Sequence, residues 1–355
     1  MLEGLREVAR RAMGGGAHAE VAGPAYAGAW YCRDEAIMGT AIRVELMASD
    51  AGVAAAAMND VMDEMHRIDR AMSPHKPDSE LSRINREAAA GPVALSREMA
   101  GLLARALEFS RLSDGAFDIT YAGVGRLYDY RQRVRPDAAA LARARPAVGY
   151  RQLELDEAAA TVRFGHPGMC IDLGGFAKGH AVENAAALLR RHGIAHAIVT
   201  AGGDSRILGD RAGRPWTIGV RDPRRPGELA AVLPLRDVAV STSGDYERYF
   251  EEDGVRYHHI LDPRTGRSPD RVRSVTTIAP DGLSSEALSK CVFVLGAAAG
   301  LRLVEGRPGA DAVVVDADGA LHFSAGLRPA ARSAARPAQL PIHPRAESSA
   351  KKATV

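Results

Sequence analysis

The chain has 355 residues, of which 46% are hydrophobic and 25% charged, and its formal net charge is +2. These proportions are typical of a globular protein and exclude a largely disordered chain or a coiled coil as the main body. Arginine and lysine are interspersed with aspartate and glutamate rather than gathered in a basic block, so we expect no nucleic-acid partner.

The N-terminal segment, residues 1–30, is rich in alanine and glycine and predicts a loosely ordered stretch. It lacks the continuous apolar run of a secretory signal, and no window of the chain has the apolar length needed to cross a bilayer. We therefore expect no transmembrane segment and, for the chain as written, a cytoplasmic protein. Residues 327–355 consist largely of alanine, proline, arginine, serine and lysine. That composition predicts a disordered tail and leaves 31–326 as the folded body.

Alternating apolar residues predict a half-buried strand over residues 40–46. Asp50 is placed to cap a helix over about 52–71, where apolar positions recur at helical spacing. Further helices are predicted, in chain order, over 96–113, 178–193 and 285–295. Further strands are predicted over 197–200, 216–220, 230–233 and 275–278, followed by a hairpin over 313–323 that turns at Asp318-Gly319.

Helices and strands are intermingled without a regular strand–helix–strand repeat, and no repeat of fixed period is present. This pattern favours an α+β fold over a doubly wound parallel sheet. The three cysteines, Cys32, Cys170 and Cys291, form no CxxC pair. They predict buried apolar thiols rather than a zinc site or a disulfide framework.

Glycine-rich junctions carry the strongest chemical signal, because the common dinucleotide, P-loop, zinc-protease and serine-hydrolase motifs are missing. The first junction is IDLGGFAKG at 171–179, where paired glycines precede a predicted helix. Backbone N–H groups at such a turn can bind a phosphate, and Lys178 adds positive charge. A tight turn that needs glycine for positive φ explains the same residues equally well.

Two further junctions follow. AGGD at 201–204 comes after an apolar strand, and STSGDYER at 241–248 is followed by HHILDPRTG at 258–266. The last segment places a histidine before an apolar pair and an Asp-Pro turn, where it could act as a positioned base. A single histidine is more often an ordinary core or surface residue, and AGGD alone is a weak signal.

Taken in order, IDLGGFAKG, AGGD, STSGDYER, HHILDPRTG and SEALSKCVFVLG resemble the ApbE family, the FAD:protein FMN transferases. Upstream, MGT at 38–40, MS at 72–73 with SELSRIN at 79–85, and SDGAFDIT at 113–120 fit the same pattern. The resemblance thus extends from about residue 38 to 327, and several motifs in order are more specific than any one. It implies a two-lobed α+β fold related to the T-fold, with mixed sheets and covering helices.

In that family, FAD lies between the lobes with its pyrophosphate on a Mg²⁺ ion. FMN passes to a threonine hydroxyl of a partner flavoprotein while AMP leaves. Matched motif by motif, the resemblance implies FAD contacts from Met38, His75, Ala116, Phe117, Asp118, Gly174, Lys178, His180 and Ile260. His259 matches the functional histidine of the family and is the candidate catalytic residue.

The resemblance also implies a set of Mg²⁺ ligands. The family uses a carbonyl of the glycine-rich turn, which matches Ala177, and an Asp and a Thr spaced four residues apart on one helix face. The corresponding residues here are Glu286 and Lys290. Glu286 is a hard oxygen ligand one methylene longer, whereas Lys290 cannot ligate a cation while it is protonated. Ser289, one residue away, is the candidate substitute ligand.

The predicted function is therefore metal-assisted transfer of FMN from FAD to an acceptor flavoprotein. Two alternatives would use the same site. One is hydrolysis of FAD to FMN and AMP with water as the nucleophile. The other is FAD binding without turnover, which Lys290 beside the expected ion suggests. Because the family is often exported, a periplasmic or membrane-associated location is the alternative to the cytoplasm.

Overall fold

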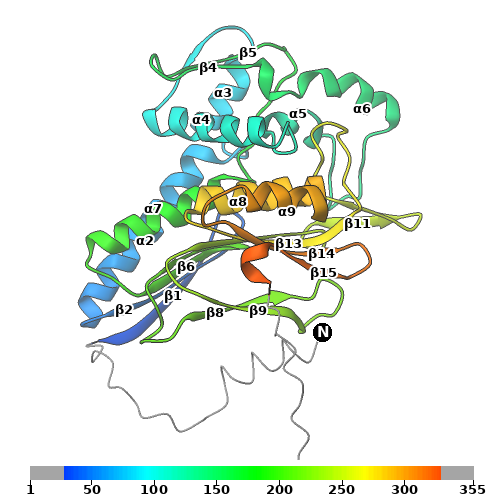
Figure 1. The fold of residues 1–355 in the computed structure, drawn as a ribbon. Helices are drawn as coiled ribbons and strands as arrows, with labels where there is room; N and C mark the ends of the chain where they lie inside the picture. The colour runs from blue at the N-terminus through cyan, green and yellow to red at the C-terminus, as the bar shows by residue number, and fades with distance from the viewer. Residues whose placement is uncertain (1–27, 329–355) are drawn as a thin grey trace, which may run out of the picture.

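The structure, a computed structural model, describes residues 28–328 and has two lobes (Figure 1). The larger lobe is built on an eight-stranded sheet in the order β1-β2-β6-β7-β10-β13-β14-β15, in which every neighbouring pair is antiparallel. Its strands are β1 (Ala29–Ile37), β2 (Thr40–Ala48), β6 (Ala197–Ala201), β7 (Asp204–Leu208), β10 (Ala239–Gly244), β13 (Val272–Ala279), β14 (Asp311–Asp316) and β15 (Leu321–Phe323).

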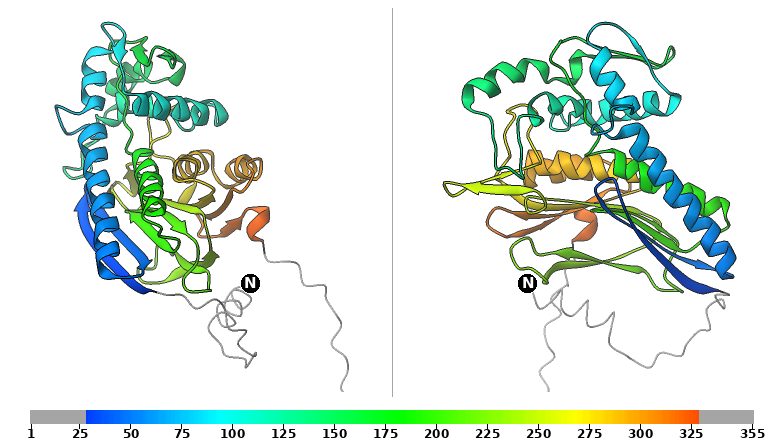
Figure 2. Two further views of the ribbon diagram at one scale, coloured as in Figure 1. Left: turned by 90° about the vertical axis from the view of Figure 1, so that its left-hand side faces the viewer. Right: turned by 180° about the vertical axis from the view of Figure 1, so that it is seen from behind.

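Helices cover one face of this sheet, and a hairpin covers the other (Figures 1 and 2). The covering helices are α2 (Ala51–Met72), α7 (Ala177–Arg191), α8 (Gly282–Leu295) and α9 (Ala297–Glu305). The hairpin consists of β8 (Trp216–Arg221) and β9 (Leu229–Leu235). Trp216 packs there against Ile207 and Val240 of the large sheet. The sheet is therefore buried on both sides, and its helical side faces the second lobe.

The smaller lobe lies beyond the covering helices (Figure 1). It carries a three-stranded sheet in the order β3-β5-β4. Its elements are α3 (Glu80–Glu87), β3 (Val93–Ala94), α4 (Arg97–Leu112), η1 (Ile119–Tyr121), α5 (Ala122–Gly125), α6 (Ala138–Ala144), η2 (Arg145–Ala147), η3 (Tyr150–Gln152), β4 (Leu153–Asp156) and β5 (Thr161–Phe164).

Three phenylalanines join the lobes. The ring of Phe109 on α4 lies 6.2 Å from that of Phe117 and 6.1 Å from that of Phe176, and the rings of Phe117 and Phe176 are 5.5 Å apart. Phe176 immediately precedes α7, so this aromatic contact fixes the start of that helix against the smaller lobe. A separate hairpin of β11 (Tyr249–Glu252) and β12 (Val255–His258) projects from one side of the larger lobe, and η4 (Ala325–Leu327) follows the last strand.

The predicted α+β class and two-lobed arrangement are confirmed, and so are the helices and strands that periodicity indicated. Asp50 caps α2 by accepting from the backbone N–H groups of Gly52 and Val53. The β14–β15 hairpin turns through Gly319 at φ 85°. The prediction of a loosely ordered stretch over residues 1–30 is wrong for its last two residues, because β1 begins at Ala29. Residues 1–27 and 329–355, which include nearly all of the predicted tail, lie outside the described residues.

The cysteine prediction is right for one residue and wrong for another. Cys291 is buried, which raises the pKa of its thiol to about 12, whereas Cys32 is exposed on β1 and Cys170 is half-buried. Within residues 28–328, no helix combines the length and the apolar character needed to cross a membrane.

Candidate functional site

Two glycines bring α7 and α8 into backbone contact. A Cβ atom on Gly179 would overlap the carbonyl oxygen of Gly282, and a Cβ on Gly282 would overlap the carbonyl oxygen of Gly179. Because neither position has room for a side chain, the helices cross closely at this point. The crossing places Lys178 on α7 directly opposite Glu286 on α8.

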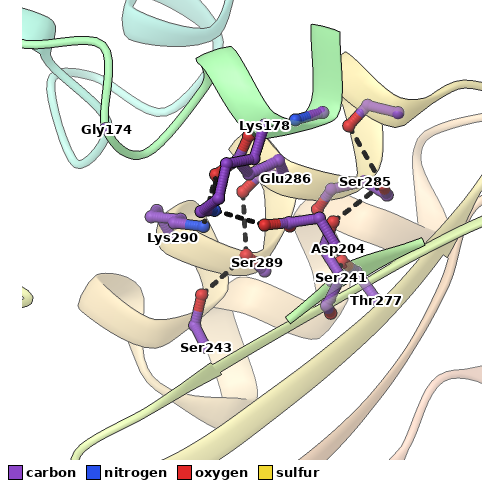
Figure 3. Close-up of polar contacts among 12 residues, drawn as sticks. Gly174, Lys178, Asp204, Ser241, Ser243, Thr277, Ser285, Glu286, Ser289 and Lys290 are labelled. Carbon is purple, nitrogen blue, oxygen red and sulfur yellow. Dashed lines mark hydrogen bonds and ion pairs between the residues drawn. The ribbon is translucent and has the colours of Figure 1, made fainter. Parts of the chain in front are cut away.

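Four charged side chains, Lys178, Asp204, Glu286 and Lys290, form what we call the ion cluster (Figure 3). The Lys178 Nζ donates to Glu286 Oε1 at 2.6 Å and also to Asp204 Oδ2. The Lys290 Nζ lies 3.3 Å from the same Glu286 Oε1. Glu286 Oε2 accepts from the backbone N–H of Gly179 at 2.7 Å. Two ammonium groups therefore face two carboxylates, and the cluster is close to electrically neutral.

The carboxylates of the ion cluster are buried and the ammonium groups are partly open. The side chains of Glu286 and Asp204 are 0% and 2% exposed, whereas those of Lys178 and Lys290 are 25% and 20% exposed. Burial opposes the charge on Asp204, but Lys178 and Lys290 outweigh it and hold the pKa of this carboxyl below its ordinary value. Burial likewise opposes the charge on Lys178, yet Asp204 and Glu286 raise its pKa. Both groups are therefore ionised at neutral pH.

The glycine-rich turn lies beside this cluster. Asp172 Oδ1 shapes the turn by accepting from the N–H of Gly174 at 2.7 Å and from the Tyr121 hydroxyl at 3.1 Å. Gly174 is exposed. A Cβ atom on Gly175 would lie 3.4 Å from Lys290 Cε, so the Lys290 side chain runs along the turn. The predicted phosphate-binding turn thus has an ammonium group next to it.

His259 follows the β11–β12 hairpin, and its N–H donates to the carbonyl of Arg248 at 3.0 Å. Its Nδ1 is buried and has no hydrogen-bond partner among the described residues. Burial, reinforced by positive charge from His258, Lys290 and Arg248, lowers the pKa of His259 to about 3. The imidazole is therefore neutral at pH 7 and has an unused ring nitrogen.

His258 plays a different part from its neighbour. Its Nε2 lies 2.9 Å from the carbonyl oxygen of Pro269, and its ring meets Phe293 of α8 edge to face at 5.4 Å. Burial lowers the pKa of His258. These contacts tie the hairpin to α8 and so help to fix the position of His259.

Met38 and His75 belong to segments that meet at one cavity. Met38 occupies the β1–β2 turn at φ 55°, and Gly202 of the β6–β7 turn donates its N–H to the carbonyl of Ala41, the second residue of β2, at 3.0 Å. Met38 lines a cavity of about 560 Å³ together with Ala36, Ile37, Gly39, Thr40, His66, Asp69 and Lys76. His75 is exposed and precedes Lys76 of this lining.

Ala116, Phe117 and Asp118 are buried, and Asp118 uses both of its carboxylate oxygens within the protein. Oδ1 accepts from the N–H and the hydroxyl of Thr120 at 2.8 and 2.7 Å, and Oδ2 accepts from the N–H of Tyr150 at 2.7 Å. Burial raises the pKa of this carboxyl. The segment therefore orders the smaller lobe beside the glycine-rich turn. Ile260, also predicted to contact FAD, is 6% exposed and belongs to the main core.

His180 does not join the ion cluster. It follows Lys178 by two residues on α7, which turns its side chain by about 200° around the helix. Its Nε2 lies 2.7 Å from Glu98 Oε1 on α4, and the same carboxylate oxygen accepts from Arg67 Nη2 at 2.7 Å. His180 thus packs against α2 and α4, away from the other predicted site residues.

Asp204 is a member of the ion cluster that sequence reasoning missed. AGGD alone is only a weak glycine signal, yet its aspartate starts β7 and accepts from Lys178. A carboxylate directly after paired glycines was the available signal. Polar side chains on β10 were missed as well, because Ser241 and Ser243 point to α8, where their hydroxyls lie 2.9 and 2.8 Å from those of Ser285 and Ser289 (Figure 3).

The predicted metal ligands do not fit a divalent cation as they are arranged. Glu286 accepts from two ammonium groups and a backbone N–H, and Lys290 is itself a cation. The Ser289 hydroxyl donates to the Glu286 carbonyl at 2.8 Å and faces Ser243 rather than the ion cluster. Ala177 begins α7 and can offer only its carbonyl. Among residues 28–328, no group of three or more His, Cys, Asp or Glu side chains is arranged to hold a metal ion.

The fold and the site together define a class: a two-lobed α+β protein with a glycine-rich turn and paired ammonium groups at a helix crossing, and with a neutral, buried histidine. The ApbE family model matches residues 38–314, and the chain belongs to this family.

The relatives of the chain agree with this assignment. A Treponema pallidum protein named FAD:protein FMN transferase is 35% identical over 316 residues, covering 84% of this chain and 87% of the relative. A Haemophilus influenzae protein of the same name is 33% identical over 283 residues, covering 76% and 81%. The crystal structure of the ApbE protein from Thermotoga maritima matches with a TM-score of 0.78 at 34% identity, covering 84% of this chain and 98% of that one. The flavin transferase ApbE from Vibrio cholerae matches with a TM-score of 0.75 at 28% identity and the same coverage.

Proposed function

We propose that this protein is an FAD:protein FMN transferase. In the proposed reaction, a threonine hydroxyl of an acceptor flavoprotein attacks the phosphorus of the FMN half of FAD. The bond from that phosphorus to the bridging oxygen breaks, AMP leaves with the bridging oxygen, and the hydroxyl proton passes to a base, for which His259 is the candidate. Membership of the ApbE family and the names of the relatives support this proposal.

The observation that carries the proposal is the pair of ammonium groups, Lys178 and Lys290, beside the glycine-rich turn. Attack on a pyrophosphate requires neutralisation of its negative charge and alignment of the attacking oxygen. The carboxylates of the cluster are buried, whereas the two ammonium groups are partly exposed, so these groups, the open Gly174 and the start of α7 offer hydrogen-bond donors to an anion at one place. Met38 and His75, beside the cavity of about 560 Å³, are proposed contacts for other parts of FAD.

His259 is the proposed catalytic residue. Its imidazole is neutral, so a ring nitrogen can accept a hydrogen bond from the acceptor hydroxyl and align it for attack once FAD and the acceptor are in place. A pyrophosphate dianion bound nearby favours the protonated imidazole, so FAD itself raises the proton affinity of this group. His259 then becomes a better base when the substrate is present.

The Mg²⁺ ion and its ligands stay predictions from the family resemblance. Because Glu286, Ser289 and Lys290 are arranged unfavourably for such an ion, no step of the proposed reaction is assigned to it. The FAD contacts of Ala116, Phe117, Asp118, His180 and Ile260 also stay predictions. The buried contacts of Asp118 and His180 favour a supporting part for both.

The test is incubation of the protein with FAD and a flavin-acceptor protein, followed by denaturing electrophoresis read by flavin fluorescence. A fluorescent acceptor band supports the proposal, and an acceptor whose target threonine is replaced by alanine is the control. Free FMN and AMP without a labelled acceptor would identify an FAD pyrophosphatase instead. Bound but unchanged FAD would identify a flavin-binding protein without turnover.

A further inference from the structure

We propose that the Lys290 ammonium replaces the divalent cation at the pyrophosphate site, so that this protein binds FAD without a metal ion. The inference rests on the proposed function, since it takes FAD to be the ligand of the glycine-rich turn. It concerns an anionic ligand, a pyrophosphate diester, and the residue that neutralises it.

The position of Lys290 is the first support. Lys290 and Glu286 are four residues apart on α8, and the Lys290 Nζ lies 3.3 Å from Glu286 Oε1. The aliphatic part of Lys290 packs along Gly175, so that its ammonium lies beside the turn rather than in bulk solvent. With 20% of its side chain exposed, the ammonium can still reach a bound anion. The electrostatic effect of Lys290 on both Asp204 and His259 agrees with this central position.

The charge balance is the second support. In the protein without FAD, Lys178 and Lys290 already offset Asp204 and Glu286, so the cluster has no net negative charge to attract a divalent ion. A threonine at position 290 would instead leave one ammonium with two carboxylates and a net negative charge. That arrangement, unlike the present one, would attract a cation.

The direction of the neighbouring hydroxyl is the third support. Ser289 could restore a metal site only if its oxygen turned toward Glu286 Oε1. Its hydroxyl is instead buried between the Glu286 carbonyl and Ser243 Oγ, each 2.8 Å away. The residue that could have compensated for Lys290 is thus committed to the contact between α8 and β10.

The experiment measures FAD affinity by quenching of flavin fluorescence, with Mg²⁺ and with EDTA. For the wild-type protein we expect the same dissociation constant in both conditions. Lys290→Thr should bind FAD about ten-fold or more weakly in EDTA, because a charge-assisted contact is lost, and should recover affinity when Mg²⁺ is added. Lys290→Met, which offers no oxygen, should lose the same affinity and should not recover it.

Two controls make the result specific to this position. Lys290→Arg keeps the positive charge and should stay independent of metal. Arg302→Thr removes an exposed positive charge from α9 by the same kind of substitution and should leave FAD affinity unchanged in both conditions. Circular dichroism of each variant without FAD checks that it is folded.

The wild-type measurement decides the matter even if a variant does not fold. A loss of wild-type FAD affinity of about ten-fold or more in EDTA would overturn the inference and leave the proposed function intact. Equal metal dependence of wild type and Lys290→Thr would overturn it as well. A wild-type protein that binds no FAD in either condition would refute the proposed function itself, and the inference with it.

Discussion

Gly179 and Gly282 touch backbone to backbone, and this contact sets the distance between the helices that carry Lys178 and Glu286. Neither glycine has room for a Cβ atom, because the carbonyl oxygen of the other occupies the space. The site thus depends on two residues that have no side chain to contribute to chemistry.

Replacing Gly282 by alanine should push α7 and α8 apart. We expect Gly282→Ala to lower the free energy of unfolding by about 1–3 kcal/mol, because an added methyl group in a packed contact forces the backbone to shift. Thermal or urea unfolding measures this. The matched control is Gly101→Ala on α4, an exposed helical glycine where an added methyl group would meet nothing within 4 Å. There, alanine should stabilise the protein by about 0.5–1 kcal/mol. Equal effects at the two positions would contradict the close crossing.

The buried charge of Asp204 should contribute strongly to the free energy of unfolding. Asp204→Asn removes a charge that faces Lys178, at a side chain that is only 2% exposed. We expect the substitution to lower the free energy of unfolding by about 3 kcal/mol. Urea unfolding at neutral pH measures this loss. Asp34→Asn is the control, since Asp34 is 57% exposed and pairs with Arg43 on the surface. Its effect should stay below about 1 kcal/mol. A small effect at Asp204 would show that the buried pairing contributes little.

The periodic parts of the fold could be predicted from the sequence because their signals are local. The cap at Asp50 and the apolar spacing of α2 are both contained within the segment that folds. The glycine-rich turn and Lys178 could be found in the same way, whereas Glu286 was indicated only by the resemblance to the ApbE family. Short strands such as β3, with 2 residues, carry too few positions for a period to be visible.

The partners of site residues could not be predicted, because they are set by packing between distant segments. Asp204 lies 26 residues after Lys178 in the chain. The two side chains meet only because β7 lies next to the start of α7. His180 follows Lys178 closely in sequence, yet the helix turns it toward Glu98 on α4. Which face of α7 meets which neighbour is a property of the assembled fold rather than of the motif.

His259 should matter for transfer and little for FAD binding. We expect His259→Ala to slow FMN transfer to an acceptor by about a hundred-fold or more, the usual contribution of a positioned proton-accepting group. FAD affinity should change little. His192→Ala is the control, because His192 pairs with Asp60 at the far end of α7. Release of AMP at the wild-type rate by His259→Ala, with acceptor present, would remove this histidine from the mechanism.

The pH dependence of transfer should reveal how FAD changes His259. In the free protein the pKa of His259 lies at about 3, below its ordinary value of 6.5, because of burial and of the positive charges of His258, Lys290 and Arg248. The neutral, active form therefore persists as the pH falls well below 6, so the acid limb of kcat/KM, which reports the free protein, should lie at low pH. Bound pyrophosphate adds negative charge beside the imidazole and raises its pKa, so the acid limb of kcat should lie at higher pH than that of kcat/KM. Steady-state rates measured across the pH range in which the protein stays folded give both limbs. Acid limbs at the same pH, or a limb of kcat/KM near 6.5, would show that His259 is not the group that titrates under the influence of FAD.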